Sequence, residues 1–394
     1  AASGRGDRVP RRFFDFGGPK EEADQRDPGR QAKCGEYQNN AGSLVTAEES
    51  PFGWAVVSRH DASEQDGYWP GGNPPGEVKQ EWRELRLANS KEVDKGTGQS
   101  VVKVSLCGDA DPVMVPYCMT LGYTKTMCTL ALTGAHVQGA LPLGEMPAQR
   151  ALVVGLGAGS MPVWLNHTFP DGKMVVDSLE IDPSVVAMAT GAMGFPKSAL
   201  RPMTDKFEAA ADAIAGADGQ PLRMYTMGAE EFVEGLAVKA EGTDYRYDMV
   251  FIDAFDKAGK VPPCLVDPEG VFLKGLSRLL SPRATVVLNL LVGLTGAGSS
   301  GGPVEIDAMV TAINNACVLE GGEVFTVRTP IDESSGNVEH CFLRAGRPGS
   351  REEPLQQALL ASAAAVNEGF PADSEGEGIR YDFSRRFKVG WGVW

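Results

Sequence analysis

A glycine-rich segment, Val154-Gly155-Leu156-Gly157-Ala158-Gly159-Ser160, follows a run of apolar residues and precedes a helical pattern. Glycines there let the backbone bend sharply and let a ligand approach without meeting a Cβ atom. Glu180 follows about twenty residues later, and an acid at that place can accept hydrogen bonds from both hydroxyls of a ribose. The pattern predicts a nucleoside site formed by Gly155, Gly157, Gly159 and Glu180. The alternative is a tight turn beside an ordinary surface acid.

Two further acids, Asp253 and Asp256, follow another apolar run. Asp253 is expected at the carboxyl end of a buried strand, where open α/β sheets bind their ligands. A carboxylate there can orient or deprotonate an amine, or can pair with the positive charge of a ligand. Asp256 can hold a second amine. The alternative for Asp253 is a structural role, as the cap of the loop that follows.

A redox dinucleotide is the competing ligand for a glycine loop of this kind. Its fingerprint is G-x-G-x-x-G, whereas this chain has G-x-G-x-G followed by Ser160. The spacing therefore favours a nucleoside cofactor that is not a redox dinucleotide.

The elements that carry these residues form an alternating pattern from residue 149 onward, which predicts an α/β fold with a mostly parallel sheet. The predicted strands are 151–154, 174–180, 223–225, 248–253 and 284–290. The predicted helices lie near 160–167, 184–192, 205–215, 229–239 and 270–280. Two later strands, 323–328 and 338–344, are expected to add an antiparallel edge.

Four units are predicted along the chain. Residues 1–75 are rich in Gly, Pro, Asp and Arg, which favours an extended arm. Residues 76–148 predict a small β-rich domain, and residues 149–347 form the α/β core. Residues 348–394 form a tail with a helix at about 352–367.

The small β-rich domain is predicted from two stretches that alternate between apolar and polar residues, 82–87 and 101–106. The turn-rich residues 95–98 between them predict a hairpin. Residues 116–134 then predict a helix that leads into the core.

The composition is that of a soluble globular protein, with 42% apolar residues, 23% charged residues and a net charge of −15. An acidic chain lacks the basic footprint of a nucleic-acid binder. Seven scattered cysteines without a CxxC pair predict free thiols in a reducing compartment. The four histidines show no ligand spacing, so no metal is predicted. No apolar run is long enough to span a bilayer.

Residues 150–291 resemble the spermidine synthase superfamily. They most resemble its methyltransferase branch, which includes the C-terminal domain of the enzyme that methylates the N-terminus of elongation factor 1-alpha. The resemblance rests on the glycine loop, Leu179-Glu180-Ile181-Asp182-Pro183, residues 247–253, Val261-Pro262-Pro263 and Leu288-Asn289-Leu290. Gln99-Ser100 and Gly336-Asn337-Val338-Glu339 resemble the first and last hairpins of the family, so that the likeness spans residues 80–345.

This resemblance implies a class I methyltransferase (Rossmann-like) fold, with a late antiparallel edge that suits methyltransferases better than dehydrogenases. It implies S-adenosylmethionine, or its decarboxylated form, as the cofactor. The implied cofactor-binding residues are Gln99, Gly155, Gly157, Gly159, Glu180 and Asp182, and the implied catalytic residues are Asp253 and Asp256. Methyl transfer to a protein amine is favoured over aminopropyl transfer to a polyamine. Lys125 stands in the segment that is acidic and aromatic in polyamine synthases.

The chain departs from the family pattern at two places. Gly228 stands where the family has an Asp that binds the adenine amino group. Either Glu230 or Glu231 substitutes for it, or both belong to the next helix. Residues 281–284 replace the usual Pro-Glu-Gly-type turn. These departures keep a second hypothesis open, in which the chain is an inactive, cofactor-free relative that serves as a structural or assembly subunit.

Aromatic residues near both ends of the chain point to a protein partner, since exposed aromatics are enriched at interfaces. They are Phe13, Phe14, Phe16, Phe387, Trp391 and Trp394. The alternative is that they pack on the protein's own surface. The first residue is Ala1. This start is expected of a mature protein from which a plastid or mitochondrial targeting peptide has been removed. The alternative is a cytoplasmic protein whose sequence is cut at this point.

Overall fold

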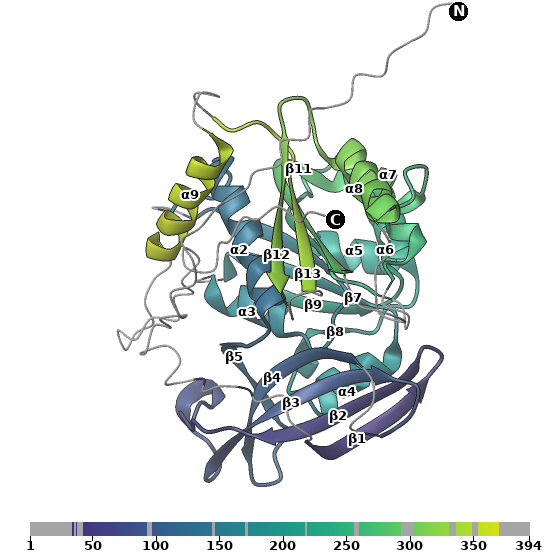
Figure 1. Cartoon of the computed structure of the whole chain (residues 1–394). Coiled ribbons are helices and arrows are strands. Elements are labelled where there is room, and N and C mark those ends of the chain that lie inside the picture. The colour runs from purple at the N-terminus through teal and green to yellow at the C-terminus, as the bar shows by residue number, and fades with distance from the viewer. Residues whose placement is uncertain are drawn as a thin grey trace, which may run out of the picture.

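The computed structural model describes residues 34, 37, 42–92, 97–143, 146–169, 172–216, 219–255, 260–292, 303–330, 336–348 and 354–369. Within these ranges the chain forms one sheet of five strands and one of eight. The first sheet lies at the bottom of Figure 1 and the second above it, surrounded by helices. The predicted α/β fold class, with a small β-rich domain before the core, is confirmed.

The first sheet is an antiparallel meander in chain order. Its strands are β1 (Ser43–Ser50), β2 (Gly53–Asp61), β3 (Val78–Ala88), β4 (Thr97–Cys107) and β5 (Val113–Met119), and η1 (Pro70–Gly72) lies between β2 and β3. The predicted hairpin is the β3–β4 pair.

Two sequence predictions fail in this sheet. The predicted extended arm reached residue 75, but β1 and β2 lie inside it. The strand β1 is polar and mostly exposed, as edge strands often are, so its sequence shows little alternation. The helix predicted from residue 116 begins at Gly122 instead, because residues 113–119 pair with β4 as a strand.

The second sheet has the order β12-β13-β11-β10-β6-β7-β9-β8. Its strands are β6 (Gln149–Val154), β7 (Met174–Glu180), β8 (Leu200–Arg201), β9 (Leu222–Thr226), β10 (Tyr247–Ile252), β11 (Leu280–Val292), β12 (Glu323–Pro330) and β13 (Gly336–Leu343). Six neighbouring strands run parallel, in the order β11-β10-β6-β7-β9-β8. The strand β13 pairs antiparallel with both β11 and β12. The five predicted core strands and the antiparallel edge are confirmed. Only the two-residue β8 was missed.

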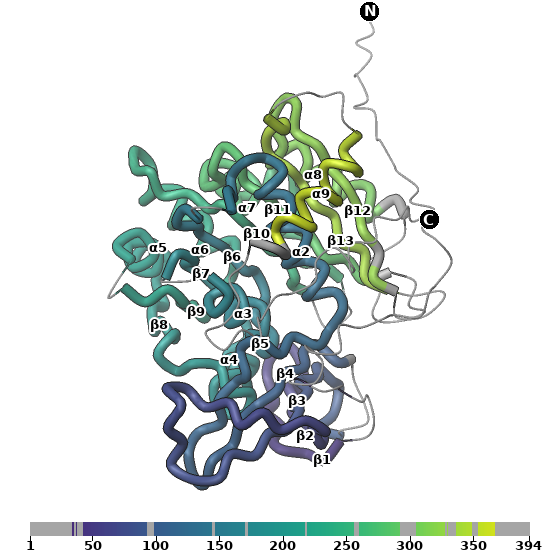
Figure 2. The backbone as a smooth tube through the Cα atoms, turned by 90° about the vertical axis from the view of Figure 1, so that its left-hand side faces the viewer, coloured from purple at the N-terminus to yellow at the C-terminus, as the bar shows by residue number. Residues whose placement is uncertain are grey.

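Helices cover both faces of this sheet and enclose two apolar cores. The helices α2 (Gly122–Val137), α3 (Ser160–Thr168), α4 (Pro183–Gly191) and α9 (Leu355–Gly369) contribute to one core. The helices α5 (Lys206–Ala215), α6 (Ala229–Lys239), α7 (Val271–Leu279) and α8 (Pro303–Cys317) contribute to the other. Short turns η3 (Lys197–Ala199) and η5 (Pro263–Leu265) complete the described elements. Figure 2 shows α9 beside α2, far from it in sequence.

A buried polar network fixes β7, the strand that ends at Glu180. The guanidinium of Arg223 on β9 donates to both carboxylate oxygens of Asp177 at 2.7 and 3.2 Å. The hydroxyls of Tyr245 and Tyr247 donate to the same carboxylate at 2.7 and 2.8 Å. Both charged side chains are almost fully buried, so their pairing offsets a large desolvation cost. This network holds β7 and β9 in register below the strand ends that carry the site.

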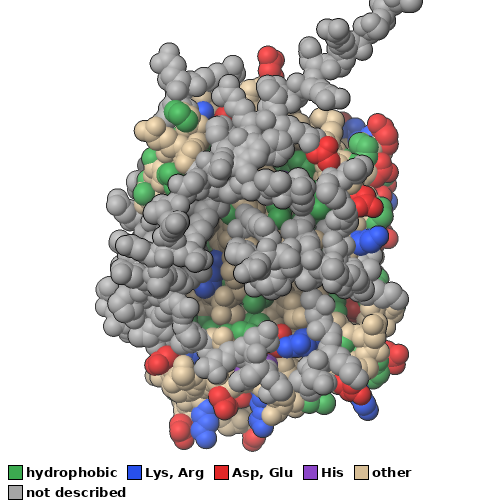
Figure 3. All heavy atoms as spheres, viewed as in Figure 1, with side chains coloured by type: hydrophobic (Ala, Val, Ile, Leu, Met, Phe, Trp, Pro, Cys, Tyr) green, Lys and Arg blue, Asp and Glu red, His purple; other side chains and the backbone are tan. Residues whose placement is uncertain are grey.

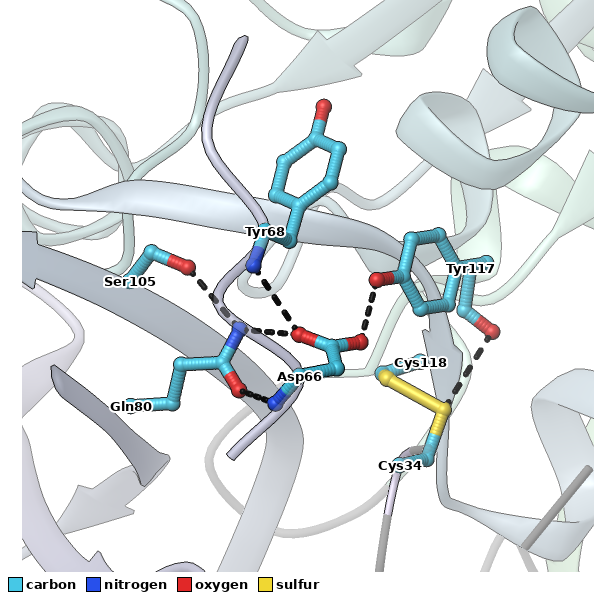
Figure 4. Close-up of a disulfide and its surroundings, with 7 residues drawn as sticks. All are labelled: Cys34, Asp66, Tyr68, Gln80, Ser105, Tyr117 and Cys118. Atoms are coloured by element: carbon cyan, nitrogen blue, oxygen red, sulfur yellow. Dashed lines mark hydrogen bonds between the residues drawn. A yellow bond between two sulfur atoms is a disulfide. The ribbon is translucent and has the colours of Figure 1, made fainter. Parts of the chain in front are cut away.

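The cysteines correct another prediction. Cys34 and Cys118 form a disulfide, with their Cα atoms 5.5 Å apart, so the prediction that all cysteines are free thiols is wrong for this pair. Figure 4 shows the disulfide beside Asp66 and Tyr117, on the first sheet. The two cysteines are 84 residues apart in sequence, and only the folded sheet brings them together. The remaining five cysteines are free.

Three further features concern the charged surface, membrane spans and metal ligands. On the face drawn in Figure 3, acidic and basic side chains are interspersed along the lower edge, over the first sheet. No helix within the described ranges is long and apolar enough to cross a bilayer. The same ranges hold no group of three or more His, Cys, Asp or Glu side chains placed to bind a metal ion.

Candidate functional site

A cavity of about 720 Å³ lies at the carboxyl ends of β6, β7 and β10, where the second sheet meets β3 and β4 of the first. It brings together most of the residues that the sequence singled out. Gln99, Gly155, Gly157, Glu180, Asp182 and Asp253 all line it. Asp256 lies outside the described residues. A second cavity, of about 520 Å³, lies at the opposite edge of the sheet and contains none of these residues.

The glycine loop is shaped by two close approaches. Gly155 has a φ of +95°, and a Cβ atom there would collide with the backbone carbonyl of Asp253. Gly157 has a φ of +53°, and a Cβ atom there would collide with the hydroxyl of Ser100 on β4. The two glycines therefore let the loop after β6 lie against both the end of β10 and the first sheet.

Gly159 has a different part in this loop. It does not line the cavity, and a Cβ atom on it would meet the ring of Phe195. The third glycine of the motif makes room for packing of α3 rather than for a ligand. A direct cofactor contact of Gly159 stays a prediction, and the described geometry gives it no support.

Glu180 lies at the end of β7 and is tied to the glycine loop. Its Oε2 atom accepts a hydrogen bond from the backbone N–H of Leu156 at 3.1 Å, and its Oε1 atom accepts one from Asp182 at 3.0 Å. Burial raises the pKa of Glu180, and these two backbone donors work in the opposite direction. Each carboxylate oxygen has a second lone pair, so Glu180 can still accept hydrogen bonds from a ligand in the cavity.

Asp182 is largely engaged within the protein. Its Oδ1 atom accepts a hydrogen bond from the backbone N–H of Ser184 at 2.9 Å and so caps α4. Its Oδ2 atom accepts one from the hydroxyl of Ser50 at 2.6 Å. Asp182 therefore joins the first sheet to the second at the rim of the cavity, a role that the sequence did not predict.

Asp253 follows β10 and is held by side chains that sequence reasoning did not assign. The Nδ2 atom of Asn289 donates to its Oδ1 atom at 2.8 Å, and Asn337 donates in turn to the Oδ1 atom of Asn289 at 3.0 Å. Burial raises the pKa of Asp253 to about 6, while Asn289 and the hydroxyl of Tyr123 lower it. Asn289 is the polar residue inside the otherwise apolar run 286–290, and this pattern could have indicated a role in the site.

Tyr123 connects β4 to Asp253 at the end of β10. It belongs to the first turn of α2, lines the cavity and donates its hydroxyl to the carbonyl oxygen of Gln99 at 3.0 Å. Burial raises its pKa well above the ordinary value, and Asp253 adds to the rise. Tyr123 is therefore a neutral hydroxyl beside Asp253. Its sequence context gave no signal, because the acidic and aromatic pattern of polyamine synthases is absent there.

The structure also describes the surroundings of Gly228. Glu230 and Glu231 lie in the first turn of α6, and both line the cavity together with Gly228. A Cβ atom placed on Gly228 would lie 3.9 Å from Oε2 of Glu231 and 3.8 Å from Cδ1 of Ile181. Glu231 thus places a carboxylate oxygen within contact distance of the Cβ position that an Asp at 228 would have. From the sequence, Glu230 and Glu231 either substitute for the missing Asp or belong to the next helix. These two alternatives are compatible, because residues of that helix line the cavity.

Comparisons with known proteins agree with this geometry. No family model matches the sequence. The chain is 26% identical over 218 residues to human eEF1A lysine and N-terminal methyltransferase, a match that covers 54% of this chain and 25% of that protein. It is 28% identical over 141 residues to a polyamine aminopropyltransferase from Vibrio vulnificus, covering 36% and 37% of the two chains. The matches thus span 25% and 37% of the length of these two curated relatives.

A solved structure extends the likeness to the fold. A probable spermidine synthase from Corynebacterium glutamicum superposes with a TM-score of 0.50 at 12% identity, covering 81% of this chain and 86% of that chain. The fold is therefore shared over most of the chain. The resemblance to spermidine-synthase-like class I methyltransferases that the sequence predicted is confirmed.

Proposed function

We propose that this chain, which has the fold of the spermidine-synthase-like class I methyltransferases, is an S-adenosylmethionine-dependent transferase that methylates an amine on a protein. The observation that carries the proposal is the meeting of the glycine loop, Glu180 and Asp253 in one cavity of about 720 Å³. When bound, the cofactor supplies a methyl group activated by a positively charged sulfur.

The residues present fit such a cofactor. Gly155 and Gly157 let the loop after β6 pack against Asp253 and Ser100, and both glycines line the cavity, where their backbone can approach a ligand. Glu180 has acceptor positions for two ribose hydroxyls at the end of the neighbouring strand. Glu231 provides the carboxylate that an adenine amino group needs, in place of the Asp that is absent at position 228.

Asp253 is the group that handles the acceptor amine. An amine must be neutral to react, so its proton must leave before or during the transfer. A carboxyl group with a pKa of about 6 is mostly ionised at neutral pH, yet it binds a proton more readily than an exposed Asp. Asp253 therefore orients the amine by hydrogen bonding and accepts its proton. Asn289 fixes the direction of the carboxylate, which favours one orientation of the nucleophile.

The alternative of an inactive assembly subunit depended on Gly228 and on the aromatic residues at both ends of the chain. Those aromatic residues lie outside the described ranges. Glu231 offsets the loss at Gly228, and the described residues leave the cavity open. These observations support the transferase over the subunit.

Thermal shift with S-adenosylmethionine, its decarboxylated form and S-adenosylhomocysteine tests the cofactor. A ligand that binds only the folded state raises the melting temperature by mass action. We expect S-adenosylmethionine and S-adenosylhomocysteine to stabilise the wild type and the Glu269→Ala control, because Glu269 is exposed and does not line the cavity. Mass spectrometry of amine-bearing peptides then follows methylation. The absence of any shift with all three ligands refutes the proposal.

A further inference from the structure

The turn between β1 and β2 brings a phenylalanine from the first sheet to the cavity of the second. Phe52 lines this cavity and is 39% exposed. Ile181, which directly follows β7, lines the same cavity and is 57% exposed. Large apolar side chains that stay in water beside a cavity indicate a surface that a ligand covers.

The turn is held in place by defined contacts. The hydroxyl of Ser50 donates to Oδ2 of Asp182 at 2.6 Å, and the backbone N–H of Phe52 donates to Oγ of Ser50 at 3.0 Å. Gly53 has a φ of +125°, and a Cβ atom on it would lie 2.9 Å from the carbonyl oxygen of Ala88. The turn therefore has one preferred conformation. Its hydrogen bond to Asp182 holds it beside Ile181.

The polar groups around this end of the cavity define the ligand. Ile181 lies next to the position of Gly228, where Glu231 places its carboxylate. A flat heteroaromatic ring with an amino group on its edge satisfies both features, because its face packs on apolar side chains and its edge donates to the acid. Glu180, one residue before Ile181, is the acceptor for the attached ribose.

We propose that Phe52 forms the second wall of a purine-binding slot, stacking on the face of the base opposite Ile181. The inference rests on the proposed function, since the base is that of the cofactor. It adds that the nucleoside site belongs to both sheets, with Ser50 and Asp182 connecting them. Binding of a purine nucleoside then covers the two exposed side chains and strengthens the contact between the sheets.

Isothermal titration of the full chain with S-adenosylhomocysteine tests this wall. We expect Phe52→Ala to weaken binding about tenfold or more, as loss of base–aromatic stacking does elsewhere, and Phe52→Leu to weaken it less. Ser50→Ala should fall between the wild type and Phe52→Ala, because it frees the turn. Phe207→Ala is the matched control, since Phe207 is 40% exposed on α5 and does not line the cavity.

Phe52→Trp gives a readout that does not depend on affinity. An indole stacked on a base changes its fluorescence when S-adenosylhomocysteine is added, whereas an indole in water does not respond. Wild-type affinity in Phe52→Ala, or unchanged fluorescence in Phe52→Trp at saturation, overturns the inference and leaves the proposed function intact. A wild type that binds neither S-adenosylmethionine nor S-adenosylhomocysteine overturns both. Circular dichroism confirms that the variants are folded.

Discussion

The side-chain amide of Asn289 donates a hydrogen bond to the carboxylate of Asp253 at 2.8 Å, from one strand to the end of its neighbour. Asn289 itself accepts from Asn337 at 3.0 Å, so the chain of hydrogen bonds begins on the antiparallel edge of the sheet. The last hairpin, far from the glycine loop in sequence, therefore orients the carboxylate that we propose to hold the acceptor amine.

Asn289→Leu is expected to shift the pH dependence of the transfer. Asn289 lowers the pKa of Asp253, which burial has raised to about 6, so its removal moves that pKa upward. Because the reaction needs ionised Asp253, the acid limb of the kcat profile should move to higher pH, and the rate at neutral pH should fall. The measurement is kcat against pH at saturating substrates. Affinity for S-adenosylhomocysteine is the internal control, since Asn289 does not line the cavity. An unmoved acid limb would show that Asn289 is only structural.

Glu180→Ala should weaken cofactor binding without unfolding the chain. Hydrogen bonds to a charged group contribute about 1.5–3 kcal/mol each, so losing the ribose contacts should raise the Kd at least roughly tenfold. Glu180→Gln should also bind more weakly, because its amide group turns a donor toward the N–H of Leu156 or of Asp182. Isothermal titration measures both variants beside Glu269→Ala. Unchanged affinity in Glu180→Ala counts against the ribose assignment.

The core of the fold could be predicted because local signals there agree with tertiary structure. The bounds of β7 and of α6 match their predicted ranges, since apolar residues predominate in β7 and recur at helical spacing in α6. The edge strand β1 and the short β8 carry no such signal, because exposed or very short strands need little apolar alternation. The helix α8 was not predicted, although it packs on the second core.

The positions of two candidate site residues in the fold could also be predicted from the sequence. Glu180 and Asp253 each follow an apolar run, which indicates an acid at the end of a buried strand. Tyr123 reaches Asp253 only through the packing of α2, and Asn337 on β13 reaches it only through Asn289. No spacing in the sequence reveals these contacts. The Cys34–Cys118 disulfide was missed for the same reason.

An exchange of acids between positions 228 and 231 tests the adenine contact. Glu231→Ala should weaken binding of S-adenosylhomocysteine, because the base amino group loses its acceptor. Adding Gly228→Asp to that variant should restore affinity, since a Cβ atom at position 228 meets nothing closer than 3.8 Å and the new carboxylate lies near the old one. Titrations of the single variants and the double variant form the comparison. Failure of Gly228→Asp to rescue Glu231→Ala would place the adenine amino group elsewhere.

Glu339→Gln is expected to stabilise the protein increasingly as pH rises. Glu339 on β13 is fully buried, and its contact with the side chain of Thr329 lowers its pKa only in part. Burial raises its pKa from 4.5 to about 8, and the neighbouring Asp253 adds to the rise. Between these two values the folded state keeps a proton that the unfolded state has lost. The contribution of Glu339 to the free energy of unfolding should therefore fall by about 1.4 kcal/mol for each pH unit across that window, and be constant outside it.

Glutamine has nearly the same shape as protonated glutamate and does not ionise. The Glu339→Gln variant therefore does not lose stability as the pH rises through this window. Urea unfolding at several pH values should show the two stability curves meeting near the lower end of the window and separating toward pH 8. Glu241→Gln, which removes one negative charge from an exposed position, is the control and should follow the wild type. Parallel curves for Glu339→Gln and the wild type would mean that Glu339 is ionised in the folded protein. The carboxyl group beside Asp253 would then carry a charge at neutral pH.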